Sequence, residues 1–214
     1  HGPNVPRMLG LKQLPPAQDG KILPAEAYDI KVMSLAFAGD SAPAIWRGPM
    51  IDKAIQQFLF DVAWGALDVL VVDLPPGTGD AQLSLTQRIP VDGAIIVSTP
   101  QVVALDDARK GIAMFQKVDV PVLGLVENMS FFQCPDCGSA HHIFGHGGAV
   151  KLAAELDLPL LAEIPLEPLI REDSDSGLPA VLDPQSGSHR AFQGLAEAVA
   201  ERLGLLQTTA EVIS

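Results

Sequence analysis

The two cysteines of this chain are separated by two residues, in the segment Cys134-Pro-Asp-Cys137. The C-x-x-C spacing allows a single metal centre to take both thiols. Two cysteines in a chain without other thiols are typical of a metal site or a redox dithiol, and not of a disulfide framework. Iron–sulfur clusters are generally held by four thiolates, whereas one copy of this chain supplies two. This count predicts that two copies meet across a shared [4Fe–4S] cluster.

Three histidines that follow the cysteines leave a zinc site open as an alternative. His141, His142 and His146 provide enough nitrogen ligands to complete a Cys2His2 tetrahedron within one chain, and such a site needs no second copy. Histidines in a loop are more often solvated than bound to metal. A thioredoxin-like redox role is weaker, because Cys134 follows an Asn-Met-Ser-Phe-Phe stretch and does not open a helix.

A carboxylate and a glycine-rich turn follow the apolar run Val69-Leu-Val-Val. Asp73 suits the water shell of a Mg²⁺ ion, and Gly77 and Gly79 let backbone N–H groups approach a terminal phosphate. Ligands of open α/β sheets gather at this edge of the sheet. A strand followed by an ordinary turn explains the same residues, so both interpretations stay open on spacing alone.

The phosphate loop G-x-x-x-x-G-K-[ST] of P-loop enzymes does not occur in these 214 residues. The nearest match is Gly20-Lys21, which has Pro15 in place of the first glycine and Ile22 in place of the magnesium-binding hydroxyl. Because aligned phosphate donors supply most of the binding and catalysis, we expect neither tight ATP binding nor turnover from this stretch alone.

Short apolar runs alternate with segments of helical spacing along the chain. Strands are expected at residues 31–35, 69–73, 93–98, 122–126 and, more weakly, 160–164. Helices are expected around residues 51–62, 105–115 and 192–203, the last of them stopped by Gly204. This alternation predicts a three-layer α/β fold with a mostly parallel sheet flanked by helices. We expect one domain, residues 1–214, with a C-x-x-C loop at about 130–146.

Charge and hydropathy restrict the possible partners. The net charge of −12 argues against a nucleic-acid partner, because that binding needs clustered Lys and Arg. The mean hydropathy of +0.25 fits apolar strands covered on both faces. No apolar run is long enough to cross a bilayer, and no signal peptide opens the chain. We therefore expect a cytoplasmic protein that binds neither nucleic acid nor membrane.

Several segments, in order, closely resemble the Mrp-type iron–sulfur cluster carrier ATPases of the MinD/ParA-like deviant Walker P-loop group. They are His1-Gly-Pro-Asn-Val-Pro-Arg-Met-Leu-Gly-Leu11, Trp46-Arg-Gly-Pro-Met50, Asp73-Leu-Pro-Pro-Gly-Thr-Gly-Asp80, Glu127-Asn-Met129 and Cys134-Pro-Asp-Cys137. The resemblance covers nearly the whole chain. It implies a P-loop NTPase-like fold without its first strand and phosphate loop, which members of that family carry upstream of the segment resembling residue 1.

The resemblance also implies roles for individual residues. Asp73 is similar to the Walker B residue that holds Mg²⁺ through water, and Gly77 to the glycine that faces the γ-phosphate. Asn128 is similar to the residue that hydrogen-bonds adenine, because an amide can donate and accept on one base edge. Pro165 resembles the loop that flanks the base. A turn-capping Asn and a plain loop proline remain alternatives for the last two.

For the intact protein, the resemblance implies an ATPase whose cofactors are a [4Fe–4S] cluster, ATP and Mg²⁺. It also implies a homodimer bridged by the cluster, with apo iron–sulfur proteins as recipients. One alternative is a metal-binding scaffold protein that has lost nucleotide chemistry. A second is a MinD/ParA-like partitioning switch, which gives no reason for the C-x-x-C segment.

Overall fold

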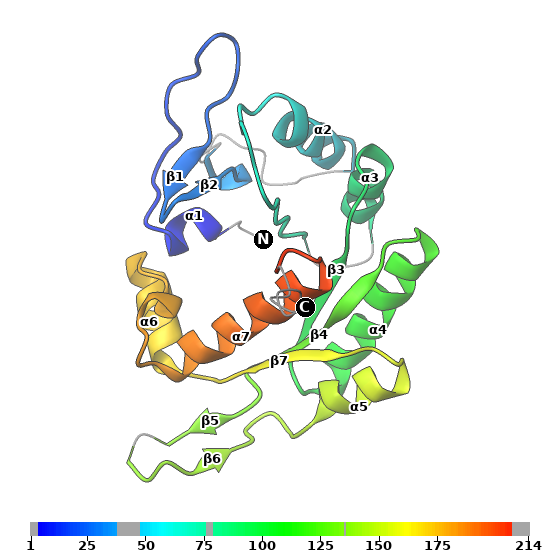
Figure 1. Cartoon of the computed structure of the whole chain (residues 1–214), viewed down its shortest axis with the longest axis vertical. Coiled ribbons are helices and arrows are strands. Elements are labelled where there is room, and N and C mark those ends of the chain that lie inside the picture. The colour runs from blue at the N-terminus through cyan, green and yellow to red at the C-terminus, as the bar shows by residue number, and fades with distance from the viewer. Residues whose placement is uncertain (1–3, 38–47, 76–78, 135, 207–214) are drawn as a thin grey trace, which may run out of the picture. The chain divides into compact units, whose positions relative to one another are not determined.

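The computed structural model describes residues 4–37, 48–75, 79–134 and 136–206 (Figure 1). It has two compact units. The first comprises His1–Pro90 with Arg171–Pro179, and the second Val91–Ile170 with Ala180–Ser214. The single domain expected for residues 1–214 stays a prediction. Within the described residues, no helix is both long and apolar enough to span a membrane.

A parallel sheet of three strands forms the centre of the second unit. The strands are β3 (Ala94–Ser98), β4 (Val122–Asn128) and β7 (Leu160–Ile164), in the order β3-β4-β7. The prediction of strands at these three places is confirmed. Because the strands are parallel, their carboxyl ends meet at one edge of the sheet, and side chains that follow them are brought together there.

Helices cover both faces of this sheet. Figure 1 shows α4 (Val102–Lys117) and α5 (Gly148–Glu155) on one side and α7 (Gly187–Arg202) on the other. The buried face of α4 is spaced at four and three residues: Ala108, Ile112 and Phe115. The end of α7 follows the sequence prediction, since Gly204 adopts φ +67° and its N–H donates to Glu201. The three-layer α/β architecture is thereby confirmed.

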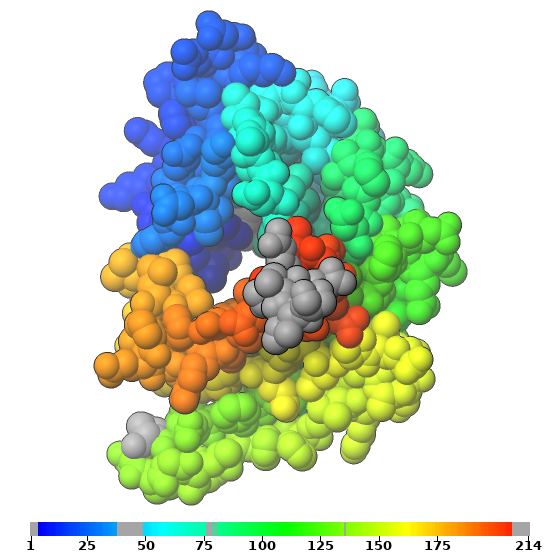
Figure 2. Space-filling view, in the orientation of Figure 1, coloured from blue at the N-terminus to red at the C-terminus, as the bar shows by residue number. Residues whose placement is uncertain are grey.

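A small antiparallel hairpin follows β4 and carries the cysteines. Its strands are β5 (Phe132–Gln133) and β6 (Ala140–His141). Figure 1 shows the hairpin extending away from the three-stranded sheet, and in the space-filling view it lies at the surface of the second unit (Figure 2). The hairpin places the turn that joins β5 to β6 at the end of this extension.

The first unit contains the other elements. They are α1 (Val5–Met8), the antiparallel pair β1 (Ala25–Ala27) and β2 (Ile30–Val32), α2 (Gly48–Phe60) and α3 (Asp80–Arg88). The helix α6 (Pro168–Ser176) contributes its last six residues to this unit, and the short 3-10 turn η2 (Ala180–Leu182) belongs to the second. Asp52 of α2 forms an ion pair with Arg88 of α3 at 2.6 Å.

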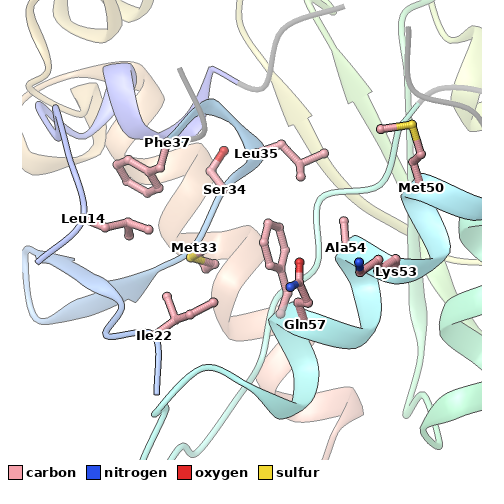
Figure 3. Close-up of a pocket in the computed structure, with 11 residues that line it drawn as sticks. Leu14, Ile22, Met33, Ser34, Leu35, Phe37, Met50, Lys53, Ala54 and Gln57 are labelled. Carbon is pink, nitrogen blue, oxygen red and sulfur yellow. The ribbon is translucent and has the colours of Figure 1, made fainter. Parts of the chain in front are cut away.

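An open, mostly apolar cavity of about 390 Å³ lies between α2 and the segment after β2 (Figure 3). Its apolar lining includes Met33, Leu35 and Phe58. Its polar lining on the α2 side includes Lys53 and Gln57. The cavity lies entirely within the first unit.

Two strand predictions fail in the first unit. Residues 69–73 form no strand, and Val71 is 86% exposed. Among the described residues, no strand pairs with this run, and an extended segment is stable only when neighbouring strands satisfy its backbone groups. The strand expected at 31–35 is shorter and pairs with β1 in a local hairpin, and not with the parallel sheet.

Candidate metal and nucleotide sites

One turn at the end of the β5–β6 hairpin presents both thiols. The N–H of Cys134 donates to the carbonyl of Ser139 (2.9 Å), and the N–H of Gly138 donates to the carbonyl of Cys134 (2.8 Å). Gly138 adopts φ +70°, a conformation that glycine reaches without a Cβ penalty. Both cysteines are free thiols, Cys134 partly buried and Cys137 exposed. The turn therefore offers a two-sulfur face to solvent.

The surroundings of Cys137 favour its thiolate. The hydroxyl oxygen of Ser139 lies 3.3 Å from Sγ of Cys137. Hydrogen bonds from the side chain and backbone of Ser139, and then from the Cys134 thiol, hold the pKa of Cys137 below its ordinary value of 9.0. Because the thiolate is the form that binds metal, this turn is suited to take up a soft metal centre.

The histidines do not complete a metal site with the cysteines. Nδ1 of His142 lies 3.3 Å from the carbonyl oxygen of Ser130, and the rings of His142 and His146 contact each other with centroids 4.1 Å apart and planes tilted by 51°. Every cysteine and histidine of this loop is described, and within the described residues no three His, Cys, Asp or Glu side chains are grouped as metal ligands. The single-chain Cys2His2 zinc site is therefore not assembled.

The structure brings together Asn128, predicted to hydrogen-bond a base, and Pro165, predicted to lie in the loop that flanks it. Asn128 ends β4 and Pro165 follows β7, and the register pairs Asn128 with Ile164. Oδ1 of Asn128 accepts a hydrogen bond from the N–H of Met129 (3.0 Å), the residue that turns the chain at φ +55°. This bond ties the side chain to the backbone of the next residue, while the amide nitrogen retains two N–H donors.

The predicted phosphate-side residues belong to the first unit. Asp73 is exposed at the end of the apolar run, and the Mg²⁺ role stays a prediction. Gly77 lies outside the described residues. The next described glycine, Gly79, is the N-cap of α3. Asp73 therefore belongs to the first unit, whereas the cysteine turn and the two base-site residues belong to the second.

A buried polar network behind the sheet edge was missed by the sequence analysis. Glu127 and Ser130 are both 0% exposed. Oε1 of Glu127 accepts from the Ser130 hydroxyl (2.7 Å), and Oε2 accepts from the N–H of Ala149 (2.7 Å) in the first turn of α5. The Ser130 hydroxyl also lies 3.0 Å from Oε1 of Glu163 on β7. The one available signal was an acid closing an apolar strand, three residues before a serine.

Comparison with known proteins places the chain among nucleotide-binding α/β proteins. Residues 1–200 match the ParA family model, described as NUBPL iron-transfer P-loop NTPase. A solved nucleotide-binding protein from Archaeoglobus fulgidus in complex with ADP is 39% identical, with a TM-score of 0.70, and the match covers 82% of this chain and 70% of that one. The Pyrococcus furiosus cell division ATPase MinD is 26% identical with a TM-score of 0.51, covering 72% and 59%.

Curated relatives narrow the assignment. The "Iron-sulfur protein required for NADH dehydrogenase, mitochondrial" of Arabidopsis thaliana is 52% identical, and the "Iron-sulfur cluster transfer protein NUBPL" of mouse is 51% identical, each over 95% of this chain. The "Iron-sulfur cluster carrier protein" of Deinococcus radiodurans is 50% identical over 96%. The chain therefore belongs to the ParA family of NUBPL iron-transfer P-loop NTPases. It spans 66%, 65% and 59% of the lengths of these three relatives, in that order.

Proposed function

We propose that the protein carries a [4Fe–4S] cluster on Cys134 and Cys137 and transfers it to apo iron–sulfur proteins. The observation that carries the proposal is the two-sulfur turn at the end of the β5–β6 hairpin. Four thiolates are the usual complement of such a cluster, so two copies of the chain would share one cluster as a homodimer. A centre held by two residues per copy at an exposed position can be bound and also released.

The exposed position of the hairpin supports transfer of the cluster to another protein, and not its permanent storage. Residues 136–143 are all exposed, so a recipient can approach Cys137 without rearranging the parallel sheet. Among the described residues, no third His, Cys, Asp or Glu side chain joins the two sulfurs as a metal ligand. The coordination supplied by one copy is thus incomplete, and ligands from a second copy or from a recipient have room to enter.

The nucleotide part of the proposal is ATP binding and hydrolysis with Mg²⁺ by the complete gene product. Asn128 and Pro165 are proposed to contact the base, since they lie at the neighbouring carboxyl ends of β4 and β7. Asp73 is proposed to hold Mg²⁺ through water, and Gly77 to face the γ-phosphate. Family membership supports the NTPase fold, and hydrolysis itself is the step to be measured. A cytoplasmic location is part of the proposal.

Anaerobic reconstitution with iron and sulfide, followed by metal analysis and sizing, tests the cluster. We expect about four irons per dimer and loss of this iron in Cys134→Ala. The matched control is His141→Ala, an exposed histidine of β6 that should keep the full iron content. Stoichiometric zinc on a monomer, or iron lost equally in the histidine variant, would reject the proposal. Iron binding without ATP turnover by the complete gene product would leave a metal-binding scaffold.

A further inference from the structure

Ser130 links the turn beside the base site to the hairpin that carries the cysteines. It follows Asn128 and Met129 directly, and β5 begins two residues later at Phe132. Its side chain is completely buried, although Met129 before it is exposed and Phe131 and Phe132 after it are only partly buried. A buried polar residue between the two candidate sites must have its hydrogen bonds satisfied inside the protein.

Each polar group of Ser130 reaches a different part of the second unit. Its N–H donates to the carbonyl of Ile164 at the end of β7 (3.0 Å). Its carbonyl oxygen lies 3.3 Å from Nδ1 of His142, which follows β6. Its hydroxyl lies 2.7 Å from Glu127 and 3.0 Å from Glu163. The residue therefore connects both strand ends of the base site to His142, the residue that follows the second strand of the cysteine hairpin.

Glu127 fixes this residue to the rest of the unit. Its second carboxylate oxygen accepts the N–H of Ala149 at the start of α5, where the helix dipole also favours a negative charge. A hydrogen bond to a charged group is stronger than one between neutral groups. The position of the Ser130 hydroxyl is thus set by β4 and α5 together.

The hydroxyl of Ser130 has one proton and two carboxylate acceptors. It can donate fully to Glu127 or to Glu163, and the shorter distance favours Glu127 in this structure. Glu163 precedes Pro165 by two residues on the strand whose end is part of the base site. A change at that strand end would alter the competition between the two acceptors, so that the hydroxyl could donate to either one.

We propose that Ser130, held by Glu127, is a positioning residue that transmits nucleotide occupancy at Asn128 and Pro165 to the cysteine turn. The inference rests on the proposed nucleotide site, but it does not require that a cluster be bound. Coupling between two sites is a ratio of affinities or reactivities, and it needs an element that both sites bias. The serine with its two acceptors is such an element.

The test measures iodoacetamide alkylation of Cys137 in the complete, metal-free gene product with and without ADP, whose binding is measured separately by calorimetry. At fixed pH we expect ADP to change the alkylation rate about fivefold, the lower end of typical site-to-site coupling. In Ser130→Ala we expect the same rate with and without ADP, while ADP still binds. A serine variant that keeps the full ADP effect would overturn the inference, as would wild-type protein that binds ADP without any change in rate.

A second variant keeps the inference testable if Ser130→Ala does not fold. Glu163→Gln replaces one carboxylate acceptor with an amide of the same shape. Glu163 is exposed, so the fold should tolerate this change. We expect it to reduce the ADP effect at least about twofold, whereas Glu201→Gln, an exposed glutamate of α7, should leave the effect unchanged. An unchanged effect in Glu163→Gln would also overturn the inference.

The outcomes separate this inference from the proposed function. Failure to reconstitute iron, with an intact ADP effect on Cys137, would reject cluster carriage and leave the coupling in place. Absence of ADP binding to the wild-type protein would reject the nucleotide site and the inference together. Iron binding with no ADP effect would reject the inference alone.

Discussion

Replacing Gly124 with alanine tests whether the close approach of β4 and β7 sets the sheet edge. A Cβ built at Gly124 would lie 2.6 Å from the carbonyl oxygen of Pro159 and 2.7 Å from Cγ of Leu161. The residue also adopts φ +154°, which side chains rarely adopt. Because the nearest clashing atom is backbone, no side-chain rotation relieves the contact, and the two strands must move apart.

The expected loss of stability is the sum of three free-energy costs. Backbone strain at the substituted residue costs about 1–3 kcal/mol. Overpacking of a close contact costs about 1–3 kcal/mol. Separation of the strands also weakens the bond from the N–H of Leu125 to the carbonyl of Pro159 (2.9 Å), which is worth about 1 kcal/mol. We expect Gly124→Ala to lower the free energy of unfolding by about 3–7 kcal/mol, a large share of the 5–15 kcal/mol typical of a folded protein.

Urea unfolding followed by far-UV circular dichroism measures the change. At a slope of about 3 kcal/mol per molar urea, the expected loss lowers the midpoint by about 1–2 M. The matched control is Gly194→Ala in the middle of α7, where an added Cβ meets no atom within 4 Å. That variant should gain about 0.5–1 kcal/mol, because alanine is the better helix former.

The reasoning is refuted if the two alanine variants unfold at the same urea concentration. A loss below about 1 kcal/mol at Gly124 would mean that the sheet adjusts without cost, since overpacking normally exceeds this value. In that case the spacing between β4 and β7 would not be fixed by the glycine, and the pairing of Asn128 with Ile164 would need another cause.

Three further predictions concern charged or ionisable groups. Glu127→Ala leaves the buried N–H of Ala149 without its acceptor and the Ser130 hydroxyl with Glu163 alone, and should cost about 1–3 kcal/mol in urea unfolding, whereas Glu127→Gln should cost less than half of that. Ser139→Ala removes the main cause that lowers the pKa of Cys137, so the midpoint of its pH-dependent alkylation should rise toward 9.0, and an unchanged midpoint would contradict this. Hydrogen bonding to Arg88 first, and then to a serine of α3, holds the pKa of Asp52 below its ordinary value of 3.8. That contribution to stability is present above pH 3.8 and is lost as the pH falls through the lower folded value. In Asp52→Asn, the melting temperature should therefore depend less steeply on pH in this acid range than in the wild-type protein. An equally steep decrease in both proteins would exclude the ion pair as its cause.

The elements of the second unit could be predicted from sequence because each has a local signature. The run that ends at Val126 is almost wholly apolar, as a strand covered on both faces requires. The spacing of Ile112 and Phe115 gives α4 a single buried face. Gly204 marks the end of α7 because few other residues adopt its left-handed conformation.

The apolar run at residues 69–73 shows where this reasoning stops. Its composition is as strand-like as that of β4, but a strand also needs neighbours that pair with its backbone. Those neighbours are a property of the fold and not of the five residues. The local sequence therefore predicts a segment that can form a strand, and not that the strand forms.

The sequence was sufficient to predict the candidate metal-binding cysteines, but not the buried residues near them. The spacing of Cys134 and Cys137 was sufficient to find the two-sulfur turn. The burial of Glu127 was not, because a glutamate at a strand end is normally expected at the surface. What stabilises it inside is the N–H of Ala149, which lies 22 positions further along the chain and is brought there by α5.

The small size of the β5–β6 hairpin has a consequence for how the protein moves. Two strands of two residues each make few backbone hydrogen bonds, so this hairpin should open far more often than the sheet from which it extends. Its amides should exchange with deuterium in seconds while those of β4 are protected for hours. Release of a centre held there would then require only local opening, and its lifetime would be independent of the melting temperature of the protein.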